Sequence, residues 1–510
     1  MKAFVCFFFA LLLTAPAFGQ EHQPVPRKAV PELQFLSYFI NQGIINNVYA
    51  QNELLRGQTV GRLFGGNTST TGSERSTYFE QRLLPFFIYT PRLFNGKAIL
   101  RASFEIDWTW GDVSYGTGGN FGSAFSADQV NIQTQNVELE FRLRPDITLN
   151  LGLQRLFDTP YNPYRTLFGT MSETGYRLAF WGSDAVGLSL HKYGDYSRWK
   201  AGFYQLYENN IEQNDDVMFF EAFHERDLSD NWRQGLSLWY LRDRANGEGG
   251  VSILGQGLAS QVNDYNGSYR FPLRGTPYDG DILWAGTFWS YNPEFRVGRT
   301  MLTGFAITNT GKVRVESDSL SDISLLGYAA NLRGGYRYGQ TARDVVVADL
   351  LYSSGDDNGI SDDQFSGVLT GNTWGSPGAI YISSGASLLL PHGNVVNRYI
   401  AAVSDLSNIG YGFTGGTLYW MKDWVPNKFY SRIGVAAGRS VATPSRGGNF
   451  MGTEGNLMLG FQPGVFMNLE LHGAYLSLGD FYDSPVVNGG SETRPDNAWT
   501  AFVVFKWLMF

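Results

Sequence analysis

A regular alternation of apolar and polar residues recurs along the chain. Between residues 98 and 110, apolar side chains occupy every second position, and polar ones such as Arg101 and Glu105 lie between them. Residues 137–144 and 147–154 repeat the pattern on either side of a short Pro-Asp turn. Because successive side chains of a β-strand point to opposite faces, this period of two predicts strands with one apolar and one polar face.

The connections between these segments alternate between short and long. Outer-membrane β-barrels have short periplasmic turns and long outer loops. The sequence therefore predicts an all-β fold, a transmembrane antiparallel β-barrel of about 18 strands within a range of roughly 16 to 20. Residues 378–404 are either a further strand pair or a folded loop. The predicted short turns lie near residues 90–96, 145–146, 193–197, 227–231, 292–295, 339–343, 424–427 and 462–465.

The stretch from Asp496 to Phe510 is long enough to cross a bilayer as one tilted strand, which needs about 9–11 residues. It is rich in aromatic and β-branched residues and ends on an aromatic one, as the assembly signal of bacterial outer-membrane barrels does. One alternate series of residues is apolar throughout, whereas Lys506 interrupts the other, so either face could meet lipid. A hydrophobic edge strand of a soluble sheet is the alternative interpretation.

The first residues have the features of a secretory signal peptide. Lys2 precedes a short apolar core, and Ala15–Gly19 offers small residues for cleavage. We predict a signal peptide over residues 1–19, a periplasmic lead-in over residues 20–51 and the barrel over residues 52–510. A cut after Gly19 removes the single cysteine, Cys6, and with it any disulfide or thiolate metal site.

Composition favours a location in the bacterial outer membrane. Aromatic residues make up 15% of the chain, whereas charged residues are only 17%, below the roughly 25% of soluble domains. No apolar run reaches the roughly 18 residues that a membrane-spanning helix needs. A net charge of −8 argues against a nucleic-acid partner. The expected partners are outer-membrane lipid and the barrel-assembly machinery.

A barrel of this size is wide enough for an aqueous channel unless loops fill it. Basic and acidic residues share the polar face of the predicted strands, and rings of basic residues favour anionic solutes. A salt-bridged wall without selectivity is an equally good interpretation. The candidate pore-lining residues are Arg82, Arg101, Glu105, Glu138, Glu140, Arg142, Arg144, Arg333 and Arg337.

The loop at residues 155–171 is aromatic and rich in Pro rather than simply hydrophilic. Such a loop either folds back into the mouth of the barrel as a constriction or packs on itself at the surface. In the first arrangement, Tyr161, Tyr164 and Arg165 would stack on and hydrogen-bond a sugar.

Three patches resemble the alginate export family of outer-membrane porins. The ladder EFRLRPDITLNLGLQRLFDTPYN, which starts at Glu140, looks like that family's strand–turn–strand repeat. Residues 78–82 resemble its early strand that ends on an inward Arg, and residues 353–359 resemble its Gly-Asp-Asp loop. The continuation at Gly359–Asp362 departs from the family pattern. The resemblance implies passage of an anionic or neutral saccharide.

Candidate metal-binding and catalytic residues are few. Four aspartates within residues 356–363 offer oxygen ligands for Ca²⁺ but lack EF-hand spacing, which favours a solvated outer loop. Neither an HExxH nor a GxSxG motif is present. Glu470 and His472 share one face of a strand, where a lumen hydrogen bond is favoured over catalysis. We therefore predict no metal site, no cofactor and no enzymatic activity.

Together these features predict a porin-like outer-membrane channel for passive passage of a polar or anionic saccharide. A plugged barrel with a surface-binding or structural role is the main alternative. An outer-membrane hydrolase is the third.

Overall fold

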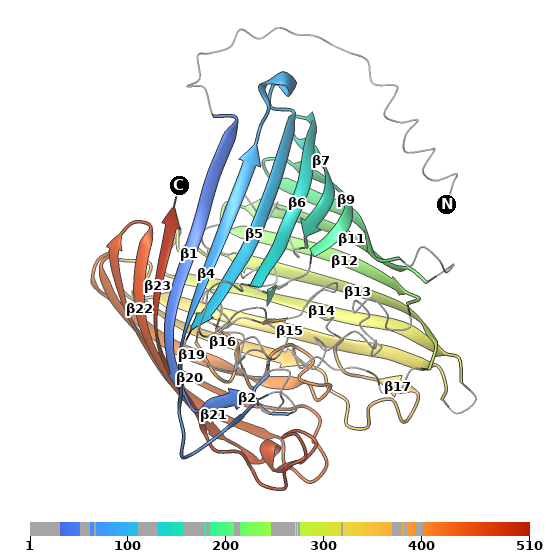
Figure 1. Ribbon diagram of the computed structural model, residues 1–510, viewed down its shortest axis with the longest axis vertical. Coiled ribbons are helices and arrows are strands. Elements are labelled where there is room, and N and C mark those ends of the chain that lie inside the picture. The colour runs from blue at the N-terminus through green and yellow to red at the C-terminus, as the bar shows by residue number, and fades with distance from the viewer. Residues whose placement is uncertain are drawn as a thin grey trace.

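The wall of the protein is one closed, antiparallel β-barrel of 18 strands (Figure 1), as the sequence predicted. The computed structural model describes residues 31–50, 62–65, 68–110, 131–156, 178–179, 184–208, 215–245, 271, 273, 276–317, 320–369, 380–381, 383, 385–392 and 401–509. The wall strands are β1 (Leu33–Asn46), β4 (Ser76–Tyr89), β5 (Ala98–Trp110), β6 (Asn131–Arg144), β7 (Ile147–Arg155), β9 (Asp184–Tyr193), β10 (Ser197–Tyr207), β11 (Val217–Ser229), β12 (Trp232–Asp243), β13 (Tyr278–Tyr291), β14 (Thr300–Val315), β15 (Ile323–Arg337), β16 (Val345–Ser353), β19 (Phe413–Val425), β20 (Phe429–Arg439), β21 (Phe450–Gly464), β22 (Met467–Leu478) and β23 (Ala498–Met509).

Strand β1 closes the barrel by pairing on both sides. Residues 37–46 pair with residues 500–509 of β23, and residues 33–46 pair with residues 76–89 of β4. Figure 1 shows β1 in blue between the paler β4 and the red β23. Closure leaves no free edge at this seam, which satisfies the backbone polar groups where water is absent.

Burial separates the two faces of the wall. In β23, Phe502, Val504 and Lys506 are buried, whereas Val503 and Trp507 are exposed. The uninterrupted apolar series of this strand therefore faces lipid, and Lys506 faces the lumen. The same division along the other wall strands places the barrel in the bacterial outer membrane, with apolar rows outward.

The barrel begins earlier than the predicted residue 52, because Leu33–Asn46 already forms a wall strand. Its lumen-facing Ile40 and Ile44 pack with Tyr78, Phe502 and Val504. Gln42 and Asn46 share the inner face with Ile40 and Ile44, and the outer face also mixes apolar and polar residues. The alternation that marks other strands is therefore missing, so this strand could not be recognised from its pattern. Residues 52–61, the start of the predicted barrel, lie outside the described part.

Short turns join the wall strands at one end of the barrel, as predicted. They comprise residues 90–97, 145–146, 194–196, 230–231, 292–299, 338–344, 426–428 and 465–466. The first includes the 3₁₀ helix η1 (Arg92–Phe94), and a second, η4 (Asp480–Asp483), follows β22 at the opposite end. In the described ranges, no helix is long and apolar enough to cross a membrane.

Described parts of the connection between β16 and β19 lie inside the barrel, so the described part of residues 378–404 is a folded loop rather than a wall strand pair. We call Ser383 and Gly385–His392 the inner segment. Leu388, Leu389 and Leu390 within it are at most 1% exposed. Short strands accompany the wall at its loop end: β2 (Val48–Ala50) pairs with β3 (Thr68–Thr70), β8 (Leu178–Ala179) with β18 (Ile380–Tyr381), and β17 (Gln364–Phe365) with β15.

The apolar core lies inside the barrel rather than around it. Trp239 and Trp284 project from β12 and β13 into one buried cluster that also contains Leu388 of the inner segment and Tyr482 of η4. The indole N–H of Trp284 donates to the backbone carbonyl of Leu369, 3.1 Å away, which ties a second part of the β16–β19 connection to the wall. Part of the lumen is thus filled by the protein itself.

We expect the stability contributed by the turn at Asp344, at the short-turn end of the barrel, to depend on pH. Burial raises the pKa of Asp344, but backbone N–H donors of Asp423, Thr341 and Gln340 and the Lys422 ammonium outweigh it and lower the pKa to about 2. Because the pKa is lowered from 3.8, the stabilisation is complete above pH 4 and is lost as pH falls toward 2. We expect Asp344→Asn to lower stability by about 2 kcal/mol at neutral pH and by little at pH 2. Urea unfolding in lipid vesicles at both pH values measures the difference, and an equal loss at both would contradict it.

Candidate functional site

The lumen wall over β4, β5 and β6 carries a ladder of paired charges. Arg82 Nη2 lies 2.8 Å from Glu105 Oε1. Arg101 Nη1 lies 2.7 Å from Glu140 Oε2 and 3.4 Å from Glu138 Oε1. All five side chains are buried. Cross-strand register places them together, since Arg101 pairs directly with Glu138 and Arg82 with Asp107.

The ladder continues around the wall to β11. Arg198 Nε lies 2.8 Å from Glu225 Oε1, and Lys200 contacts Glu221. The hydroxyl of Tyr204 also donates to Glu221, at 2.7 Å. Each of these four cations, Arg82, Arg101, Arg198 and Lys200, therefore faces a carboxylate, and the fields of the two signs largely cancel for a solute farther away.

A different arrangement occurs on the opposite wall, at Arg333 of β15 and Arg432 of β20. Arg333 Nη2 donates to the Tyr419 hydroxyl, 2.8 Å away, and the Arg432 guanidinium lies 5.9 Å from the centre of the same ring. Both arginines are at most 9% exposed, and no described carboxylate pairs with either. Arg333 Nε and Arg432 Nε and Nη2 have no hydrogen-bond partner among the described residues.

Glu454 of β21 holds the inner segment in place. Its two carboxylate oxygens accept hydrogen bonds from the backbone N–H groups of Ser387, Leu388 and Leu389 at 2.7, 2.9 and 2.7 Å. Asn456, two residues along the same face, donates to Glu454 and to the carbonyl of Gly385. The carboxylate is 2% exposed and is therefore committed to this anchor.

The inner segment also approaches β19 closely. Ser383 donates to the Thr417 hydroxyl at 3.3 Å. A Cβ atom on Gly385 would lie 2.5 Å from Thr417 Oγ1, so only glycine permits this approach. The segment thus contacts β19 at Thr417, two residues from the Tyr419 that accepts the hydrogen bond of Arg333.

A third cluster surrounds Glu470 of β22. Lys506 Nζ and His472 Nε2 each lie 3.0 Å from its Oε2, and Tyr430 donates to its Oε1 at 2.8 Å. The imidazole of His392, at the end of the inner segment, meets His472 edge to face with ring centres 5.0 Å apart. The predicted lumen hydrogen bond between Glu470 and His472 is therefore present. The Lys506 ammonium balances the negative charge of the Glu470 carboxylate.

The other sequence-predicted residues occupy separate places. Arg142 and Arg144 are exposed at the short-turn end of β6. Arg337 ends β15 with its guanidinium 5.5 Å from the ring centre of Phe295. Tyr161, Tyr164 and Arg165 lie outside the described residues. The described candidates therefore lie in three places, which are the ladder of paired charges, the short-turn end of the barrel and the surroundings of Arg333.

The acidic loop at residues 356–363 is shaped by its own hydrogen bonds. Asp356 accepts from the backbone N–H and the hydroxyl of Ser366, and Asp362 accepts from the backbone N–H of Gln364. Within the ranges that the structure describes, no group of three or more acidic, His or Cys side chains could hold a metal ion.

Sequence reasoning missed Arg432 and Glu454. Both stand on the lumen face of alternating strands, Arg432 beside Met458 of β21 and Glu454 beside Ala436 of β20. The alternation itself could have placed them in the lumen. Their roles could not be read from it, because the partners of Glu454 come from a loop more than 60 residues away in sequence.

Comparison with solved structures finds barrels of similar extent. OccK1 (OpdK) of Pseudomonas aeruginosa matches with 12% identity and a TM-score of 0.46 over 93% of this chain and 98% of that chain. OccAB4 of Acinetobacter baumannii matches with 10% identity and a TM-score of 0.47 over 94% and 98%. A BenF-like porin of Pseudomonas fluorescens matches with 11% identity and a TM-score of 0.49 over 94% and 98%. No family model and no curated protein sequence matches the chain.

The resemblance to alginate export porins is wrong. The solved structures that match include Occ, Opd and BenF-like proteins. The patches that suggested the resemblance have local causes: residues 140–154 are an alternating hairpin around a Pro-Asp turn, and Asp356 fixes a loop through Ser366. Such features arise in unrelated barrels because alternation and turn chemistry are general.

Proposed function

We propose that this porin-like barrel is a channel for the passive passage of a small polar solute, preferentially one that carries a carboxylate. The observation that carries the proposal is the pair of lumen arginines, Arg333 and Arg432, whose N–H donors have no carboxylate partner among the described residues. A guanidinium group offers a planar fork of donors that matches a carboxylate. The paired ladder from β4 to β11 supplies a polar wall along which such a solute moves.

Charge placement distinguishes these two arginines from the ladder. A carboxylate less than 3 Å from Arg82 or Arg101 cancels most of the attraction to a distant anion. Arg333 and Arg432 have no carboxylate at ion-pair distance among the described residues, and the acids that act on Arg432 from farther away, Glu454 and Glu470, are held by other partners. The low effective dielectric of a narrow lumen strengthens the field of both cations. Arg142 and Arg144, exposed at the short-turn end, extend the positive field toward the periplasm.

We expect Arg333→Gln combined with Arg432→Gln to shift the reversal potential toward cations in planar-bilayer recordings. The shift should be large at low salt and small at 1 M salt, where the Debye length is about 3 Å. The control is Arg82→Gln combined with Glu105→Gln, which removes a charge pair without changing the net charge. An equal shift in the control, or no shift in the first variant, would remove the two arginines from the selectivity mechanism.

The plugged barrel is the second candidate. It is favoured by the inner segment, whose leucines are buried in the same cluster as wall side chains such as Trp239. Absence of any conductance in the wild-type protein would support it over the channel. Catalysis is not proposed, because His472 and Glu470 are committed to Lys506, Tyr430 and the Phe502 ring.

A further inference from the structure

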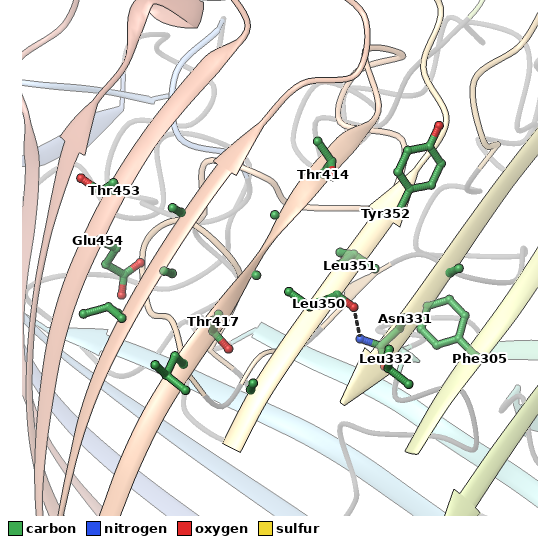
Figure 2. Close-up of a pocket in the computed structure, with 18 of the residues that line it drawn as sticks. Phe305, Asn331, Leu332, Leu350, Leu351, Tyr352, Thr414, Thr417, Thr453 and Glu454 are labelled. Atoms are coloured by element: carbon green, nitrogen blue, oxygen red, sulfur yellow. Dashed lines mark hydrogen bonds between the residues drawn. The ribbon is translucent and has the colours of Figure 1, made fainter. Parts of the chain in front are cut away.

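The lipid-facing surface of the barrel carries a groove across β14–β22 (Figure 2). Its volume is about 1360 Å³, above the roughly 300–1,000 Å³ typical of small-molecule pockets. Cross-strand register explains the hollow, since Gly416 and Ala437 lie side by side between Leu350 and Thr453. The floor is strand backbone left uncovered by small outward side chains, which are Ala306, Ala330, Ala348, Gly416, Ala437 and Gly455.

The sides of the groove are apolar and project outward. Leu332, Leu350, Leu418 and Val435 are each 45–58% exposed, while their inward neighbours on the same strands are buried. These four residues lie away from the loop ends of their strands. An apolar chain laid between them would cover the backbone and contact side chains on both sides.

The end of the groove nearest the long loops is polar. Tyr352 and Thr414 stand one residue from the loop ends of β16 and β19, above Leu350 in Figure 2. Thr453 and Ser477 are paired in register near the loop ends of β21 and β22. The hydroxyls of Thr414, Thr453 and Ser477 make no hydrogen bond to the described part of the chain. Long loops of such barrels face outward, so this end lies at the outer leaflet.

A cation stands beside the polar end, although it is not part of the groove lining. Arg439, the last residue of β20, pairs in register with Thr414. Its side chain is exposed and lies 6.0 Å from the ring centre of Phe450. It forms no ion pair with any described carboxylate. A guanidinium group at the headgroup level of the outer leaflet matches a phosphate.

We propose that this groove binds an anionic phosphorylated lipid of the outer leaflet that carries more than two acyl chains. The chains lie over Gly416, Ala437 and Gly455, and the phosphate accepts hydrogen bonds from Arg439. Headgroup oxygens satisfy the hydroxyls of Thr414 and Thr453, which otherwise lack partners at the edge of the hydrocarbon. The apolar part of the groove is followed by the hydroxyl groups of Thr414 and Thr453 and then by the Arg439 cation. This order matches that of the acyl chains, their linkages and the phosphate in such a lipid.

The experiment uses native mass spectrometry of the full-length protein in mild detergent, titrated with lipid A or with phosphatidylcholine. Gly455→Leu fills the groove without a clash, because a Cβ there meets nothing within 4 Å. Gly473→Leu is the matched control, since Gly473 is an outward glycine of β22 with equal space but outside the groove. Arg439→Gln tests the phosphate contact.

We expect wild-type protein to retain lipid A in preference to phosphatidylcholine. Gly455→Leu should weaken lipid A binding about tenfold, which corresponds to about 1.4 kcal/mol, and Gly473→Leu should leave it unchanged. Arg439→Gln should weaken lipid A binding about tenfold and phosphatidylcholine binding little. Equal losses in Gly455→Leu and Gly473→Leu, or equal binding of both lipids by the wild type, would overturn the proposal. A dimer that Gly455→Leu abolishes would overturn it in favour of a second copy in the groove.

Discussion

Replacing Glu454 by Ala is expected to raise the single-channel conductance several-fold. The carboxylate accepts three backbone N–H groups from residues 387–389, and alanine leaves all three without an acceptor. A buried donor without a partner costs about 1–3 kcal/mol, so three together favour release of the inner segment from the wall. Planar-bilayer recording of the refolded variant measures the result.

The matched control is Glu221→Ala. It removes an equally buried lumen carboxylate that contacts Lys200 and Tyr204 but not the inner segment. We expect it to change ion preference without the rise in conductance. A rise of the same size in both variants would mean that lumen charge, rather than the anchor, limits the current.

Removing Glu470 should produce the largest loss of stability. Glu470→Ala leaves Lys506 and His472 facing each other in a site where Glu470 and Lys506 are only 6% and 8% exposed. Loss of one partner of a buried ion pair costs about 3–5 kcal/mol. We expect urea unfolding in lipid vesicles to show a decrease of this size.

The double variant Glu470→Gln with Lys506→Met separates burial from charge. It keeps the volume and removes both charges, and such replacements are often close to neutral. We therefore expect most of the lost stability to return. If the double variant unfolds as readily as Glu470→Ala, packing rather than the uncompensated charge is responsible.

The sequence predicted the wall of the barrel better than its contents. Alternation reports which strands have one lipid face and one polar face, so it identified β5, β6 and β7 and the turns between wall strands. It failed at β1, where Ile40 and Ile44 share the lumen face with Gln42, so that both faces mix apolar and polar residues. An alternation of period two is visible only where the residues on the two faces of a strand differ in polarity.

The candidate site depended on contacts that no local pattern contains. Arg82 and Arg333 look alike in sequence, since both are polar members of alternating strands. Their difference lies in the register of neighbouring strands, which places Glu105 beside Arg82, and in Tyr419, which reaches Arg333 from β19. The position of the inner segment likewise depends on its hydrogen bonds to Glu454, which follows it by more than 60 residues in the chain.

The seam between β1 and β23 bears on the order of assembly. Asn47, just past β1, accepts a hydrogen bond from the backbone N–H of Trp499, 452 residues later in the chain. Contacts of such long range form late, because the intervening chain must first be brought together. Until they form, both outer strands present unpaired N–H and C=O groups that hydrocarbon cannot solvate. The edges of an incomplete barrel are therefore stable in the bilayer only while strands of another protein pair with them. Once β1 and β23 pair with each other, no such partner is needed.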